Sequence, residues 1–160
     1  MTDTVSPEKR SQVMALVGSK NTKPELLIRK RLHALGFRYR LHVKDLPGKP
    51  DLVFPRYKSV IQINGCFWHG HSCPRCRMPS SNTEYWNRKV ARNMERDAAN
   101  RRLLLNEGWR VLTIWECALT GKWKLGLSEV IALASKWLLS KESICEIKGE
   151  IGMVQNVARD

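Results

Sequence analysis

The sequence contains no apolar run that approaches the ~20 residues of a membrane-spanning helix. Its start, Met1 to Ser6, carries no basic-plus-apolar targeting signal, and the chain shows no internal repeat and no low-complexity tract. These absences exclude a membrane protein, a repeat array and a linker-rich chain. We therefore expect one cytoplasmic domain that does not enter a membrane.

Acidic residues are scarce, with 15 Asp and Glu against 28 Lys and Arg and a net charge of +13. A charge of this size favours a polyanionic partner. Nucleic acid is the better candidate because no basic amphipathic helix stands out, although a solvated basic surface is the simpler alternative. The 160 residues, of which 42% are hydrophobic, are enough for one globular domain with a moderate core.

The hydrophobic periodicity predicts four helices. A short amino-terminal helix should begin at Ser6 and carry Met14 and Val17, and it either packs on the domain or becomes ordered on DNA. Thr22 and Glu25 form a capping box, which gives Glu25 a purely structural role as one interpretation. This second helix should carry the apolar residues Leu26, Leu27, Leu32 and Leu35 and end at Gly36. A long helix capped by Thr83 should run to about residue 106, and the last should begin at Ser128.

The strand signals lie between these helices. Apolar and polar residues alternate over 37–42, and two β-rich runs at 51–54 and 59–63 are separated by a turn of hairpin length. A buried-type strand is predicted at 110–115, and the residues after about Lys141 are predicted to form a loosely attached tail. The chain thus divides into an arm at 1–20, a domain at 21–140 and a tail at 141–160. The domain should be an α/β fold in which helices flank a central mixed sheet.

A cysteine- and histidine-rich loop follows the strand at 59–63. Cys66, His71 and Cys73 are close enough in sequence for one loop to wrap a zinc ion, and a closed tetrahedral site needs a fourth ligand. Two residues could supply it: Cys76, in a Cys-x2-Cys knuckle, or Cys117, after the predicted strand at 110–115. In a reducing compartment five cysteines favour metal binding over disulfides, and Cys145 is left as a simple thiol. His69 lies outside the predicted zinc set, although it could also compete for the metal.

Asp51 begins a strand directly after a proline, where a carboxylate could hold a hard divalent cation against a phosphate oxygen. The order of a helix Glu, a Pro-Asp pair on one arm of a hairpin and a following strand resembles the PD-(D/E)xK nuclease core. The chain departs from that pattern at Gln62, Ile63 and Asn64, where the pattern has a second acid and a lysine.

A more specific resemblance is carried by motifs that occur in order from about residue 11 to 119. They are LPGKPD at 46–51, GCFWH at 65–69, Asn93, ERD at 95–97, GWRVL at 108–112 and WECAL at 115–119. Together they are similar to the very short patch repair (Vsr) mismatch endonucleases, a branch of the PD-(D/E)xK superfamily. This resemblance implies an endonuclease that nicks DNA 5′ to the T of a T:G mismatch, which is the very short patch repair of deaminated 5-methylcytosine.

The resemblance also implies roles for individual residues. It makes Cys66, His71, Cys73 and Cys117 the ligands of a structural zinc. It makes Asp51 and the backbone carbonyl of Ile63 the ligands of a catalytic magnesium, and His69 the general base, while Glu25 could orient the site. Asn64 stands where a family member has His, and its role, like those of Cys76 and Asp97, is left open.

Aromatic and basic residues around the loop suggest how a mismatch is found. Inserting side chains between bases costs the least free energy where base pairing is already weak. Intercalating rings would therefore bind a mismatch in preference to a matched base pair. We expect the side chains of Phe67, Trp68 and Trp86 to be exposed and to form such a wedge, although Trp86 could equally belong to the core. The other expected DNA-binding residues are Met14, Val17, Lys89 and Asn93.

Two other functions compete with the mismatch endonuclease: a zinc-stabilised DNA-binding module without catalysis, and a general nuclease of the same core. Asp51 and His69 favour an enzyme, and the aromatic residues favour mismatch handling. We expect double-stranded DNA with a T:G mismatch as substrate, mismatch-repair proteins as partners, a monomeric state and a nucleoid-associated location in the cytoplasm.

Overall fold

The computed structural model describes residues 22–150. The predicted amino-terminal helix, with Met14 and Val17, lies outside the described residues, as do residues 151–160 of the predicted tail. Among the described residues, no helix is both long enough and apolar enough to cross a membrane.

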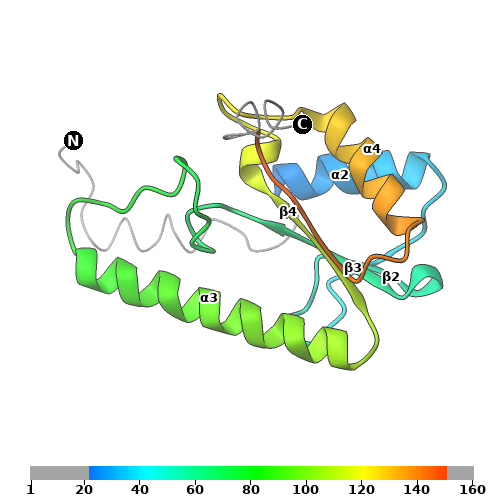
Figure 1. Ribbon diagram of the computed structural model, residues 1–160, viewed down its shortest axis with the longest axis horizontal. Helices are drawn as coiled ribbons and strands as arrows, with labels where there is room; N and C mark the ends of the chain where they lie inside the picture. The colour runs from blue at the N-terminus through cyan, green and yellow to red at the C-terminus, as the bar shows by residue number, and fades with distance from the viewer. Residues whose placement is uncertain (1–21, 151–160) are drawn as a thin grey trace, which may run out of the picture.

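One mixed sheet of five strands organises the fold (Figure 1). Its strands lie in chain order and are β1 (Arg40–Leu41), β2 (Leu52–Phe54), β3 (Ser59–Asn64), β4 (Arg110–Trp115) and β5 (Ile144–Ile147). The first three strands pair antiparallel, whereas β3, β4 and β5 pair parallel. Helices flank this sheet, which confirms the predicted fold class.

The helices cover opposite faces of the sheet. Helices α2 (Lys23–Ala34) and α4 (Leu127–Leu138) lie together on one face, and α3 (Thr83–Asn106) runs along the other (Figure 1). Side chains alternate along β2: Leu52 and Phe54 pack in the core beneath α2 and α4, while Val53 packs against Leu104 of α3. Because both faces are covered, the central strands are buried along most of their length and are mainly apolar.

Helix α2 begins as predicted, because the Thr22 hydroxyl accepts a hydrogen bond from the backbone N–H of Glu25 at 3.4 Å. The helix ends before Gly36, whose φ of +98° suits glycine. The predicted apolar face was wrong in part, since Leu27 and Leu35 are 40% and 59% exposed. The buried stripe instead runs through Glu25, Ile28 and Leu32, so Glu25 faces inward.

The helix α3 covers the predicted range, but its cap is Asn82, in the left-handed conformation with φ of 54°, in place of Thr83. Helix α4 likewise begins one residue before Ser128, after Gly126 with φ of 95°. In both cases a residue with positive φ, and no capping side chain, precedes the first residue of the helix.

Two strand predictions need correction. The strand predicted at 37–42 is reduced to β1, which ends before His42, whose backbone is left-handed with φ of 47°. Residues 144–147, predicted to lie in a loose tail, form β5 beside β4. The side chain of Ile147 is only 4% exposed in the core, so this segment belongs to the domain.

Candidate active site and metal centre

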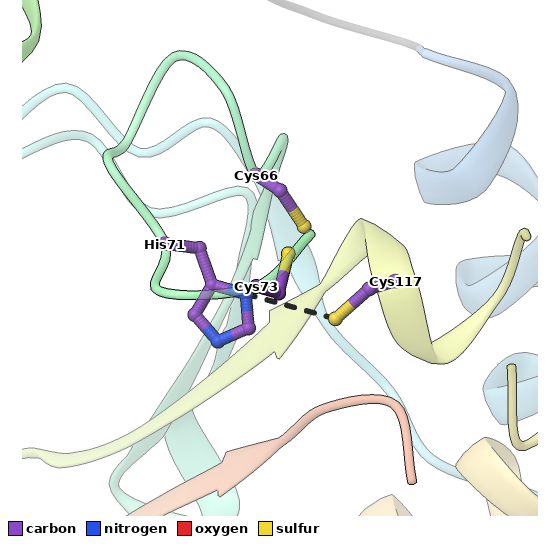
Figure 2. Close-up of side chains that lie close together, drawn as sticks. All are labelled: Cys66, His71, Cys73 and Cys117. Carbon is purple, nitrogen blue, oxygen red and sulfur yellow. Dashed lines mark hydrogen bonds between the residues drawn. The ribbon is translucent and has the colours of Figure 1, made fainter. Parts of the chain in front are cut away.

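Parallel pairing of β3 and β4 brings the cysteines together. Asn64 and Trp115 are paired at the ends of these strands, so the loop after β3 and the 3-10 turn after β4 (Glu116–Ala118) leave the same edge of the sheet. The loop carries Cys66, His71 and Cys73, and the turn carries Cys117. Figure 2 shows the four side chains pointing toward one another, and their ligand atoms lie within 4.8 Å of each other.

The group fits a tetrahedral zinc site of three thiolates and one imidazole. Burial is the main cause that raises the pKa of Cys66 and of Cys117, and the Cys73 thiol adds to the rise in both, so the thiolates need a nearby cation. Burial also lowers the pKa of His71 and keeps its imidazole neutral, which is the form that binds metal. Among the described residues, Cys76 does not belong to this group.

Neighbouring groups hold the cluster in place. The His71 ring stacks on Trp115 with centroids 4.1 Å apart and planes at 9°. The backbone N–H of Gly149, which follows β5, donates to Sγ of Cys117 at 3.3 Å. A Cβ at Gly149 would lie 2.8 Å from the carbonyl oxygens of Cys117 and Trp123, so only glycine fits here. The end of the described chain therefore packs on the candidate metal centre.

A second group lies on the other side of β3. Asp51 immediately precedes β2, and its Oδ2 accepts a hydrogen bond from the backbone N–H of Ile63 at 2.8 Å. Glu25 reaches the same place from α2 and is 1% exposed, and His42 reaches it from the end of β1. The ligand atoms of Glu25, His42 and Asp51 lie within 4.8 Å of one another.

The electrostatics of this group suit a divalent cation. Burial is the main cause that raises the pKa of Asp51 to about 6, and the charge of Glu25 adds to it, while the Ile63 N–H and His42 oppose the rise. Arg29 Nη1 donates to Oε2 of Glu25 at 2.8 Å. Two carboxyl groups held together out of water, with a strongly perturbed pKa, are typical of a functional site.

Sequence reasoning missed His42. The alternation of Phe37, Tyr39 and Leu41 assigned it to the polar side of a strand, and only the pairing of β1 with β2 brings it to Asp51. Its signal was weak: a histidine at the end of the strand that precedes the Pro-Asp turn.

His69 lies apart from the zinc cluster and contacts α3 instead. Its Nδ1 is 2.5 Å from Oδ2 of Asp97, and both side chains are about one-third exposed. A carboxylate can only accept, so Nδ1 carries a proton, and in the neutral form of the ring the lone pair is then on Nε2. The competing interpretation of His69 as a zinc ligand is not favoured by this geometry.

One cleft connects the Asp51 group with the His69–Asp97 pair. It has a volume of about 960 Å³, and the residues lining it include Asp51, Ile63, Asn64, Trp68, His69 and Asp97. The loop that carries His69 packs closely on α3: a Cβ at Gly70, where φ is +62°, would collide with the Met94 side chain. Little space therefore remains for the loop to shift against the helix.

The aromatic residues form a cluster beside the cleft. The Phe67 and Trp68 rings lie 5.1 Å apart, and each packs edge-on against Trp86, at 5.6 and 5.9 Å. Trp86 is only 7% exposed because the rings of Phe67 and Trp68 cover it. The expectation that its side chain is exposed was therefore wrong. Phe67 and Trp68 are half-buried.

Lys89 and Asn93 of α3 join this cluster to a basic face. Lys89 Nζ lies 5.5 Å from the centre of the Trp68 ring, and Asn93 Nδ2 donates to the backbone carbonyl of Trp68 at 2.8 Å. Arg88, Arg92 and Arg96 line the adjoining depression on α3. The long helix thus presents cations next to the aromatic rings and the cleft.

An α/β fold that brings a buried carboxylate and a carboxylate-bound histidine into one cleft, beside a basic helix face, is typical of metal-dependent nucleases. Comparison with known proteins defines the family. The chain belongs to the Vsr family of DNA mismatch endonucleases, as its sequence resemblance predicted. Residues 2–75 match the family model described as "DNA mismatch endonuclease Vsr".

Several curated relatives support this assignment. The "Type II nicking enzyme V.XorIIP" of Xanthomonas oryzae pv. oryzae is 49% identical over 120 residues, which cover 75% of this chain and 88% of that protein. The "Type II nicking enzyme V.NmeAIP" of Neisseria meningitidis is 49% identical over 122 residues, 76% and 87% of the two chains. The "DNA mismatch endonuclease Vsr" of Escherichia coli (strain K12) is 35% identical over 147 residues, 92% and 94%. The protein is thus an endonuclease, a hydrolase of the DNA-repair class.

Proposed function

We propose that the protein nicks duplex DNA 5′ to the T of a T:G mismatch and so initiates very short patch repair of deaminated 5-methylcytosine. The observation that carries the proposal is the cleft that joins the Asp51 group to His69 and Asp97 in a chain of the Vsr family. The E. coli relative is itself named a DNA mismatch endonuclease.

Asp51 and the backbone carbonyl of Ile63 would hold a catalytic Mg²⁺, with Glu25 beside them. Carboxylate and carbonyl oxygens are the ligands that Mg²⁺ prefers. Glu25 is already paired with Arg29, and a bound cation would offset the charge of the buried Asp51. When bound, Mg²⁺ screens the scissile phosphate and stabilises the charge that develops during hydrolysis.

His69 would act as the general base. Asp97 accepts a hydrogen bond from Nδ1–H and fixes the ring, which leaves Nε2 to remove a proton from the attacking water. The oxygen of that water forms the new bond to phosphorus while the bond to the leaving ester oxygen breaks. Asp97 therefore has the role of a positioning residue.

The zinc site would serve the fold. Cys66, His71, Cys73 and Cys117 link the loop after β3 to the turn after β4, and a zinc ion bound there stabilises the loop that carries His69.

Mismatch selection would rest on the aromatic cluster. The half-buried Phe67 and Trp68 would enter a weakened base step, supported from beneath by the buried Trp86, while Lys89 and Asn93 lie beside them. Met14 and Val17 are proposed to contact DNA from the amino-terminal arm.

A nicking assay tests this proposal. T:G and matched duplexes in varied sequence contexts are incubated with Mg²⁺ or with chelator, and Asp51→Asn is compared with Asp45→Asn, an exposed aspartate outside the cleft. We expect Mg²⁺-dependent nicking of the T:G duplex by wild type and Asp45→Asn only. Binding without nicking by the wild type would indicate a DNA-binding module, and equal cutting of matched duplexes would indicate a general nuclease.

A further inference from the structure

His42 has no part in the mechanism above, although it lies at the centre of the carboxylate group. We propose that Nε2 of His42 is a side-chain ligand of the divalent metal ion, together with Asp51 and Glu25. The site is then one of mixed nitrogen and oxygen donors. This inference rests on the proposed function, because it needs a metal ion at Asp51.

The spacing of the three donor atoms matches the coordination sphere of one ion. Nε2 of His42 lies 2.9 Å from Oε1 of Glu25 and 4.0 Å from Oδ1 of Asp51. In an octahedral site with bonds of about 2.1 Å, neighbouring ligand atoms are about 3.0 Å apart and opposite ones about 4.2 Å. Both observed distances fall within this range.

The second oxygen of each carboxylate is used for positioning. Oδ2 of Asp51 accepts from the Ile63 N–H, and Oε2 of Glu25 accepts from Arg29. The remaining oxygens, Oδ1 and Oε1, are the atoms that approach His42. Three donor atoms therefore converge on one place, while hydrogen bonds outside that place fix the carboxylates.

The backbone also holds His42 in position. Its N–H donates to the carbonyl of Asp51 at 3.3 Å, so the two residues are tied across the β1–β2 edge. Its φ of 47° is uncommon for a residue other than glycine, and such conformations persist where the surroundings enforce them. The side chain is only 13% exposed, which limits the freedom of the ring.

The competing interpretation is that Nε2–H merely donates a hydrogen bond to Glu25. The two interpretations differ in tautomer, because a ligand nitrogen needs its lone pair and the proton must then be on Nδ1. They also differ in metal preference. Imidazole binds Mn²⁺ and Co²⁺ better than it binds Mg²⁺, whereas a site of oxygen donors alone shows less discrimination.

Electron spin-echo spectroscopy of the Mn²⁺-loaded, zinc-replete protein tests the inference directly, since a coordinated imidazole gives a ¹⁴N coupling to the Mn²⁺ electron spin. We expect this coupling in wild type, its loss in His42→Asn and His42→Gln, and its retention in His69→Gln and in His33→Gln, an exposed histidine of α2. Asparagine tolerates the left-handed conformation of residue 42, so His42→Asn should fold. The Mn²⁺ dissociation constant should rise about tenfold or more in both His42 variants, and the Mg²⁺ constant should rise less.

The outcomes separate this inference from the proposed function. Absence of the coupling in wild type, its loss in His69→Gln, or its survival in the His42 variants would overturn the assignment of His42. Mn²⁺ binding that depends on Asp51 but lacks a ¹⁴N coupling would leave the proposed function standing. Mn²⁺ binding that Asp51→Asn does not weaken would instead contradict the metal role of Asp51 itself. If both His42 variants misfold, retention of the ¹⁴N coupling in His69→Gln and His33→Gln still supports His42 as the ligand.

Discussion

Replacement of Asp51 by asparagine should stabilise the metal-free protein at neutral and alkaline pH. The folded protein raises the pKa of Asp51 from 3.8 to about 6. An acid with a raised folded-state pKa contributes stability at low pH that is lost as the pH rises from the unfolded pKa to the folded one. Each unit of pKa shift corresponds to ~1.4 kcal/mol, so ionisation of Asp51 lowers the free energy of unfolding by about 3 kcal/mol at pH 8. Roughly half of this cost, ~1.5 kcal/mol, develops between pH 5 and pH 8.

Urea unfolding of the zinc-replete protein in chelator-free, magnesium-free buffer at pH 5, 6, 7 and 8 measures this cost. Asp51→Asn keeps an oxygen that can accept from the Ile63 N–H, so the difference in unfolding free energy between variant and wild type isolates the charge. That difference should grow with pH and should shrink when Mg²⁺ is added, because the ion binds only the native wild-type site. Asp45→Asn should show no such trend. A difference that is constant between pH 5 and pH 8 would refute the reasoning.

Three further predictions concern the metal centre and the aromatic cluster. Elemental analysis should find that Cys117→Ser has lost its zinc and that Cys76→Ser retains it. The reverse result would mean that Cys76, and not Cys117, is the fourth ligand. Gly149→Ala should lower the thermal midpoint and speed zinc loss to a chelator, because its Cβ would meet two carbonyl oxygens at 2.8 Å, whereas Gly36→Ala, which meets nothing within 4 Å, should keep its zinc. Trp68→Ala and Trp86→Ala should lose preference for T:G duplexes more than affinity for matched duplexes, which rests mainly on phosphate contacts; wild-type selectivity in folded, zinc-loaded variants would show that these rings have only a packing role.

The sequence predicted those elements whose signals are local. The hairpin of β2 and β3 and the strand β4 have β-rich runs bounded by turn residues, and the long helix α3 has a clear period. The strand β5 was missed because four residues carry too little pattern, and their burial depends on pairing with β4.

The candidate site was predictable to the extent that its residues are neighbours in sequence. Spacing alone left Cys76 and Cys117 as alternatives, and the parallel pairing of β3 with β4 brings Cys117 to the cluster. His42 was missed because its position results from a strand pairing and a left-handed backbone conformation. The burial of Trp86 likewise depends on how the loop packs on α3.

Single-turnover nicking of a T:G duplex with Mg²⁺ tests most directly whether the cleft is the active site. Asp51→Ala and His69→Ala should bind the duplex and retain zinc, yet nick it at least ~100-fold more slowly than wild type, because each removes one catalytic group. His33→Ala, outside the cleft, should nick at the wild-type rate. Nicking by folded Asp51→Ala or His69→Ala at a rate close to that of wild type would contradict this account.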